Sequence, residues 1–233
     1  VGQRDEPAGK AGLTALMAAL MREATLVHSA AEFAEELERI GASVSISAGQ
    51  YQTSVTVNTL TKHLTKAMSL MMERAFKPAF TGEDFDRIKS QTIEGLMANR
   101  KSAPSLAGRA IDSVLYGSTH PLSYPGAGLP STVDPITLDD IKAYYTAHFP
   151  EHLSGITVSA SLPQTEIISA LQGFASLEVT EAYRMPIDEL PEIKGRTLYL
   201  VNKEGAAQSS LRTAHPSIKY DALGDFYKAG LMN

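Results

Sequence analysis

The stretch from Gly12 to Thr25 constrains the fold of this chain more than any other. Its large apolar side chains recur at the three- and four-residue spacing of an α-helix and form one broad stripe: Leu13, Leu16, Met17, Leu20, Met21 and Ala24. The opposite face carries Ala15, Ala18 and Ala19. Small side chains let a neighbouring element approach closely, so the sequence predicts a buried helix over Gly12–Thr25 that is packed on both faces.

A second helix and a hairpin follow. Ser29 and Glu32 have the spacing of a capping box, which predicts a helix that Gly41 ends. From 43 to 48, serines alternate with apolar residues, and a second alternating run extends from 51 to 60. Two such runs around a Gly-Gln turn predict an antiparallel hairpin with one buried face.

Helical patterns dominate the rest of the chain. We expect further helices near 64–76, 83–99, 104–116, 137–149, 164–174 and from 221 onward. A loop rich in glycine and proline should occupy 118–134, and a proline-containing linker about 177–194. Additional strands are expected at Ile156–Val158, Leu198–Val201 and Gln208–Ala214. Together these patterns predict an α+β fold, a mainly antiparallel sheet covered on one face by helices.

Composition excludes several kinds of function. The net charge of −5 provides no electrostatic basis for binding nucleic acid, and the chain contains no cysteine for disulfides or thiolate metal sites. The most apolar stretch is interrupted by Arg22 and Glu23, so it does not reach the roughly 18 apolar residues of a membrane span. Because the chain starts at Val1 and stops inside a helical pattern, we expect a fragment of a longer protein.

Several short segments occur in a characteristic order: Gly9–Leu13, Ser29–Gly41, Phe85–Lys89, Leu115–Pro121, Ile136–Pro150 and Ala207–Pro216. This order resembles half of a peptidase of the pitrilysin, insulin-degrading enzyme and mitochondrial processing peptidase family. The resemblance implies a metallopeptidase half-domain of the LuxS/processing-peptidase type over residues 1–190. It also implies that 191–233 are a linker and the start of a second, similar domain.

In active members of that family, an H-x-x-E-H helix and a later glutamate supply the zinc site. The resemblance places Ala15 and Ala19 at the two histidine positions and Ala18 at the position of the glutamate that activates water. The third ligand would lie near Gly95 or Leu96, and a side chain one residue away, Glu94, is turned by about 100° on a helix. We therefore expect no catalytic residue, no metal and no enzyme activity in this chain.

The resemblance implies a partner rather than a catalyst. Two similar halves enclose an unfolded peptide in this family, and only one half holds zinc, on the same polypeptide or on a separate subunit. The peptide binds by adding a strand to a sheet edge, chiefly through backbone hydrogen bonds. The alternative hypothesis is a scaffold subunit without a peptidase role. An arginine and a tyrosine beyond Asn233 would favour the first hypothesis, and resemblance alone suggests the bacterial envelope or periplasm.

One stretch spells the zinc motif literally, His148-Phe-Pro-Glu-His152. Two histidines four residues apart share a face only within a helix, and Pro150 disfavours helix at that point. A self-sufficient zinc peptidase at this stretch is a third hypothesis to be tested. The remaining histidines are expected to be hydrogen-bonded structural residues, and a group of methionines is expected to fill the core: His28, His63, His120 and His215; Met68, Met71 and Met72.

Overall fold

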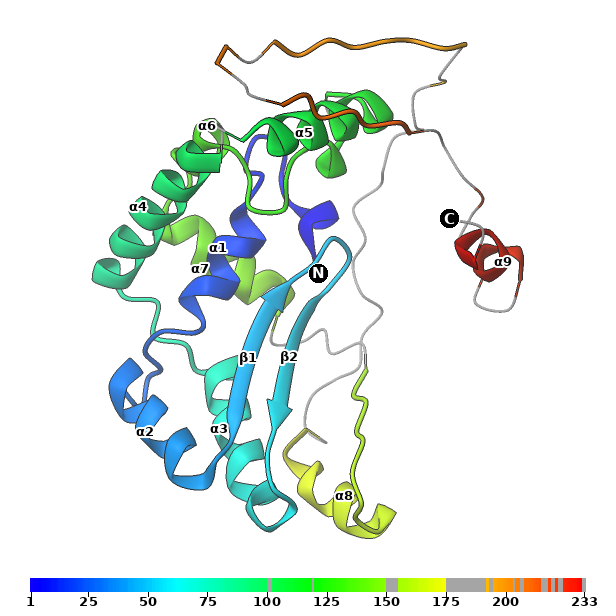
Figure 1. Cartoon of the computed structure of the whole chain (residues 1–233). Coiled ribbons are helices and arrows are strands. Elements are labelled where there is room, and N and C mark those ends of the chain that lie inside the picture. Colours follow the sequence, from blue (N-terminus) through cyan, green and yellow to red (C-terminus); the bar gives the residue numbers. More distant parts are fainter. Residues whose placement is uncertain are drawn as a thin grey trace.

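The structure, a computed structural model, describes most of the chain up to residue 174 and shorter stretches beyond it. The described residues are 1–99, 102–118, 120–149, 155–174, 192, 195–202, 204–205, 208–214, 218, 221 and 224–231. Their elements are η1 (Gln3–Asp5), α1 (Leu13–Leu20), α2 (Ala30–Ile40), β1 (Ser43–Ala48), β2 (Thr53–Asn58), η2 (Thr61–His63), α3 (Leu64–Phe76), α4 (Gly82–Asn99), α5 (Ala103–Tyr116), η3 (Pro121–Ser123), α6 (Pro130–Val133), α7 (Leu138–His148), α8 (Gln164–Ala170), η4 (Gln172–Phe174) and α9 (Asp225–Leu231). Figure 1 shows them in chain order.

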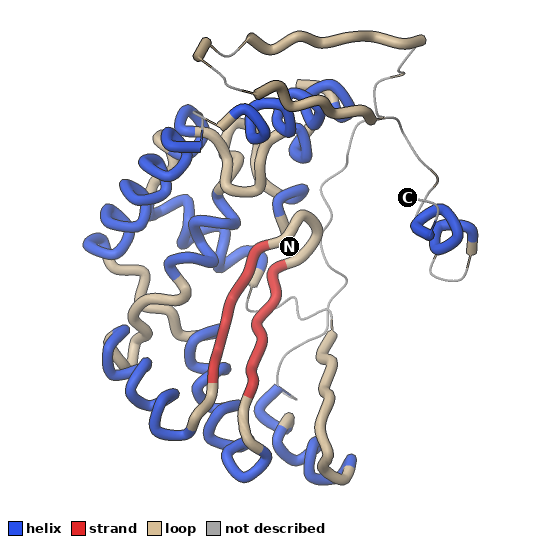
Figure 2. The backbone as a smooth tube through the Cα atoms, in the orientation of Figure 1, coloured by secondary structure: helices blue, strands red, loops and turns tan. Residues whose placement is uncertain are grey.

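The expected hairpin is present, and its buried face lies against helices. β1 and β2 are antiparallel, with Val44 opposite Val57 and Ile46 opposite Val55. Val44 and Ile46 are buried, whereas the serines that alternate with them in β1 are exposed. Figure 2 shows the hairpin beside the helices, and α1, α2 and α3 all contact it. The alternation in the sequence therefore identified the inward face. The register differs from that of a two-residue Gly-Gln turn, because residues 49–52 connect the strands and Ala48 lies opposite Thr53.

Two hydrophobic clusters hold the helices to the hairpin. The larger cluster surrounds α1: Leu13, Leu16, Met17, Ala18, Leu20, Met21, Ile46, Phe80, Phe85, Ile136, Ile141 and Tyr144. The smaller cluster joins Phe33, Leu37, Val44 and Leu70. Beside it, the guanidinium carbon of Arg74 lies 3.9 Å from the centre of the Phe33 ring. This cation–π contact covers the charge of a buried arginine with an aromatic face.

The predicted capping box opens α2. Ser29 Oγ accepts a hydrogen bond from the Glu32 N–H at 3.3 Å, and the Glu32 carboxylate accepts one from the Ser29 N–H at 2.9 Å. Gly41 ends the helix in the left-handed conformation with φ of 59°. Both signals are local in sequence, which is why the bounds of α2 could be predicted.

The first helix is shorter than the apolar stripe that predicted it. α1 ends at Leu20, whereas the expected helix extended to Thr25. Beyond it, the Leu26 N–H donates to the Lys77 carbonyl at 2.8 Å and the Ala79 N–H donates to the Ala24 carbonyl at 3.0 Å. Pairing with a segment some fifty residues later extends the backbone here, and the helical spacing in the sequence gives no sign of it.

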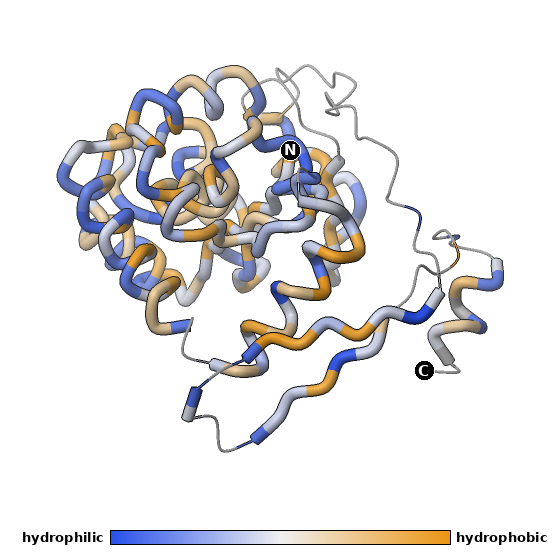
Figure 3. Tube along the Cα trace, turned by 90° about the horizontal axis from the view of Figure 1, so that it is seen from above, coloured by the Kyte–Doolittle hydropathy of each residue, from blue (hydrophilic) through white to orange (hydrophobic). Residues whose placement is uncertain are grey.

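Three expected strands are not formed in the described part of the chain. Residues 155–160, 198–201 and 208–214 belong to no strand, and the sheet consists of β1 and β2 there. Leu198 and Leu200 are 83% and 89% exposed, and Figure 3 shows the apolar stretches of these segments. An alternating pattern predicts a strand only where a neighbour pairs with its backbone, and these segments have no such neighbour among the described residues.

Smaller differences concern loops and helix ends. The loop expected over 118–134 contains the short helices η3 and α6, each with a proline in its first turn. The helix expected over 164–174 is divided into α8 and η4, and the last helix begins at Asp225 rather than near Asp221. Of the linker expected over 177–194, all but residue 192 lies outside the described residues.

Candidate functional site

α1 carries the three alanines for which sequence predicts a lost zinc motif. Ala18 is buried with 4% exposure, and Ala15 and Ala19 are half-buried. Methyl groups have no lone pair to donate to a metal and no proton to exchange with water. These positions do not fit zinc, and they can serve only as a packing surface.

The start of α1 is fixed by a residue outside the helix. Gly12 occupies the N-cap with φ of 99° and has no side chain to bond the free N–H groups of the first turn. The buried Glu6 carboxylate supplies that bond, accepting from the Gly12 N–H at 3.0 Å and from the Thr14 N–H at 2.7 Å. Burial raises the pKa of Glu6 to about 7, and the hydrogen bonds from Thr14 and Gly12 oppose that rise. Sequence reasoning missed this cap; its signal is an acid shortly before a glycine N-cap.

The neighbouring helix α4 does not complete a ligand set. α1 packs against α4, on which Glu94 and Gly95 are exposed and Leu96 is half-buried. Among the residues that the structure describes, no three His, Cys, Asp or Glu side chains are grouped so that they could hold a metal ion. In the same residues, no helix is long and apolar enough to cross a lipid bilayer.

His148 is the last residue of α7, and its ring lies 4.6 Å from the ring of Tyr144. Pro150 and His152, which complete the literal motif, lie outside the described residues. The hypothesis of a zinc site at this stretch is therefore left to experiment.

Two other histidines are hydrogen-bonded, as expected. His28 Nδ1 lies 2.8 Å from the Glu73 carboxylate, which also accepts from the Thr25 hydroxyl. His120 Nδ1 accepts from the Leu122 N–H at 3.0 Å. His63 is half-buried, and His215 lies outside the described residues.

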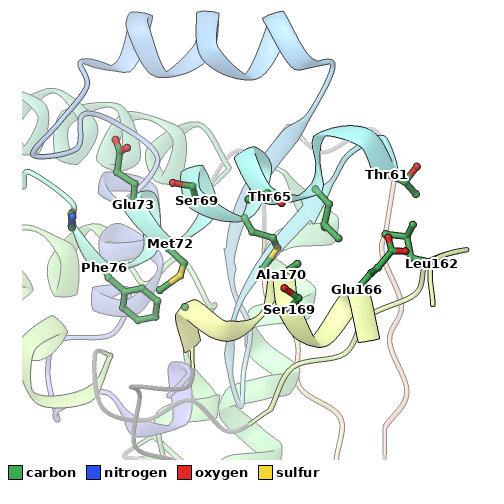
Figure 4. A pocket seen from close by; sticks show the side chains of 14 residues that line it. Thr61, Thr65, Ser69, Met72, Glu73, Phe76, Leu162, Glu166, Ser169 and Ala170 are labelled. Carbon is green, nitrogen blue, oxygen red and sulfur yellow. The ribbon is translucent and has the colours of Figure 1, made fainter. Parts of the chain in front are cut away.

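A groove between α3 and α8 encloses a cavity of about 850 Å³ (Figure 4). One row of α3 side chains lines it at four-residue spacing: Leu64, Met68, Met72 and Phe76. Leu162 and Ala170 face them from the α8 side, with Glu166 and Ser169. Two of the methionines expected in the core, Met68 and Met72, therefore line this groove; Met68 is 9% exposed and Met72 is half-buried.

The family is shown by comparison with known proteins. Residues 1–122 match the model of Insulinase (Peptidase family M16), so the chain belongs to this peptidase family. Its α+β fold is similar to that of a solved structure, a crystal structure of a peptidase M16 inactive domain from Pseudomonas fluorescens, with a TM-score of 0.69 and 23% identity over 82% of this chain and 46% of that one.

Two curated relatives differ in how they are described. The non-peptidase homolog YmxG of Helicobacter pylori is 23% identical over 196 residues, which are 84% of this chain and 45% of the relative. The uncharacterized zinc protease YmxG of Bacillus subtilis is 22% identical over 177 residues, which are 76% of this chain and 43% of the relative. The chain thus spans less than half the length of these relatives.

Proposed function

We propose that this chain is a non-catalytic half of a clam-shell zinc metalloendopeptidase. It completes the substrate chamber and helps to position unfolded peptides for a zinc-bearing partner half, on the same polypeptide or on a separate subunit. The observation that carries this proposal is the set of alanines on α1, Ala15, Ala18 and Ala19, at the positions that the family resemblance assigns to the zinc ligands and the catalytic glutamate.

The packing around α1 supports a structural role that needs no catalytic residues. The helix lies at the centre of the larger core cluster, and Glu6 caps its first turn. This packing gives α1 a structural role that does not require catalytic side chains. The name of the Helicobacter pylori relative, a non-peptidase homolog, is consistent with this role.

The hairpin is the proposed place of peptide contact. Among the described residues β1 and β2 pair only with each other, so no third strand occupies the outer edge of either, and the Val44 carbonyl of β1 accepts a hydrogen bond from Arg74 at 3.3 Å. An extended peptide can pair with such an edge whatever its side chains are. This mode of binding suits a chamber that accepts unfolded peptides of many sequences.

We also propose the domain division that the sequence suggests. Residues 1–190 form the inactive peptidase-like domain, and 191–233 are a linker and the start of a second, similar domain. Three leucine side chains are 82% to 89% exposed here, so the first domain does not bury them: Leu198, Leu200 and Leu211. A second domain would bury them in a core of its own, and their exposure therefore supports this division.

The first test is the zinc content of the purified chain, measured by elemental analysis after dialysis against trace zinc. We expect no stoichiometric zinc. Zinc at one ion per chain that is lost on His148→Ala or His152→Ala would overturn the proposal and establish a site at the literal motif.

The second test mixes this chain with a zinc-bearing half from the same family and follows cleavage of an unfolded fluorogenic peptide. We expect cleavage in the mixture and none with either half alone. The matched control is a partner whose motif glutamate is replaced by glutamine, which should abolish cleavage in the mixture. A stable complex without cleavage would favour the alternative, a scaffold subunit without a peptidase role.

A further inference from the structure

The N-terminal residues 1–6 hold the tip of the β1–β2 hairpin. The Gln3 N–H donates to the Gly49 carbonyl and the Arg4 N–H to the Gln50 carbonyl, both at 3.0 Å. The Thr53 hydroxyl donates to the Val1 carbonyl at 3.0 Å. The segment therefore bonds the turn at Gly49 and Gln50 and the first residue of β2, Thr53.

The same six residues also bond two other parts of the fold. The Gln3 side-chain amide donates to the carbonyls of Pro121, at 3.1 Å, and of Tyr124. Glu6 caps α1 through the N–H groups of Gly12 and Thr14. Residues 1–6 thus form a clasp that joins the hairpin tip, η3 and the start of α1.

Two consecutive carboxyl groups lie buried in this clasp. Asp5 is 1% exposed and Glu6 is 3% exposed, and Asp5 accepts from the Gly2 N–H at 3.0 Å. Within the described part of the chain, Glu6 makes no ion pair, while Arg4 Nε lies 3.8 Å from Asp5. The surrounding elements carry further titratable groups. Lys10 pairs with Asp140, and the hydroxyl of Tyr144 of α7 lies 3.4 Å from that of Thr14. His120 before η3 stacks on Tyr116 of α5, and Tyr51 lies at the hairpin tip near Arg4.

We propose that the clasp is pH-sensitive: ionisation of Glu6, buried beside Asp5, weakens the hold of residues 1–6 on the hairpin tip. The ionised Glu6 carboxylate is buried away from water and lies next to a second acid, Asp5, and both effects cost free energy. The hydrogen bonds from the Gly12 and Thr14 N–H groups offset only part of that cost. The inference does not depend on the proposed function, because it concerns the clasp and the hairpin alone.

The direction of the pH effect follows from the raised pKa of Glu6. In the folded chain burial raises it from 4.5 to about 7, so the folded state binds the proton more tightly than the open state. The stabilisation of the closed clasp is complete below 4.5 and is lost as the pH rises through about 7. The clasp should therefore open more often in mildly alkaline solution than in mildly acidic solution.

Hydrogen exchange measured by NMR on the full chain tests this inference. Protection factors of the Gln3 and Arg4 amides, corrected for the intrinsic pH dependence of exchange, should fall about thirtyfold between pH of roughly 5.5 and 8.5. Amides at the centre of the hairpin, in residues 44–46 and 55–57, serve as the internal reference and should change little. Constant protection of Gln3 and Arg4 over this range would overturn the proposal.

Variants separate Glu6 from other acids. Glu6→Gln should make the protection of Gln3 and Arg4 independent of pH, whereas Glu94→Gln, on the exposed side of α4, should behave as the unchanged chain does. The same pH response in Glu6→Gln would refute the role of Glu6. Should that variant fail to fold, a ¹³C titration of the Glu6 carboxyl in the unchanged chain decides: a midpoint near 7 is expected, and one near 4.5 contradicts the inference.

Discussion

Gly12 meets two structural demands that no other residue type can meet. Its φ is 99°, and a Cβ at this position would lie 2.7 Å from the Ala127 carbonyl oxygen. We expect Gly12→Ala to lower the free energy of unfolding by about 2 kcal/mol or more, because left-handed strain and a backbone clash add. Urea denaturation measures the change. As the control, Gly95→Ala, in open space on α4, should raise stability by about 0.5–1 kcal/mol, and equal effects would contradict this account.

Asp140 links the start of α7 to the loop before α1. The hydrogen bond from Lys10, and then that from the Thr137 N–H, lower the pKa of Asp140 from 3.8 to about 2. Because the folded value is the lower one, the ionised group stabilises the fold above 3.8, and this contribution is lost as the pH falls toward about 2. The partly exposed pair contributes about 1 kcal/mol or less. Thermal unfolding midpoints of Asp140→Asn should depend less on pH over this range, whereas Asp86→Asn, on an exposed site of α4, should follow the unchanged profile.

At the scale of elements, α2 depends on its capping box. Ser29→Ala removes the acceptor for the Glu32 N–H, so we expect a loss of about 1 kcal/mol of stability. Urea denaturation measures it. Ser90→Ala, in the exposed middle of α4, removes a serine without removing a cap and should be neutral or slightly stabilising. A similar loss in both variants would rule out capping as the cause.

The same contrast explains which elements could be predicted from sequence. α2 and the hairpin carry local signals, a capping box and a two-residue alternation, and both were placed correctly. The end of α1 was wrong because residues 24–26 pair with 77–79, and the strand at 156–158 was wrong because no described strand pairs with it. At the site, the alanines could be read from the sequence, but the cap that Glu6 provides could not, because helix-start signals rest on a side chain at the N-cap itself and Gly12 has none.

At the scale of the whole molecule, the exposed apolar side chains in the residues after 174 should drive self-association. Leu200 is 89% exposed, so Leu200→Lys removes apolar surface from water without removing a packing contact. We expect weaker light scattering at the same protein concentration and an unchanged thermal midpoint. Leu16→Lys, at a site with 1% exposure, should instead unfold the chain. Unchanged scattering in Leu200→Lys would show that these residues are not the contact.

The clasp also has a consequence for the order of folding. Gln3 and Tyr124 are 121 residues apart in the chain, so their contact requires a very large loop to close. The hairpin, α2 and α3 join residues much closer in sequence and can form first. Gln3→Ala should accordingly accelerate unfolding and leave the folding rate nearly unchanged in stopped-flow experiments. The N-terminal residues would then be attached to the segment around η3 only after the slowest step, and this attachment would be the first to be lost when the protein begins to unfold, whereas Glu6 can cap the nearby start of α1 without closing that loop.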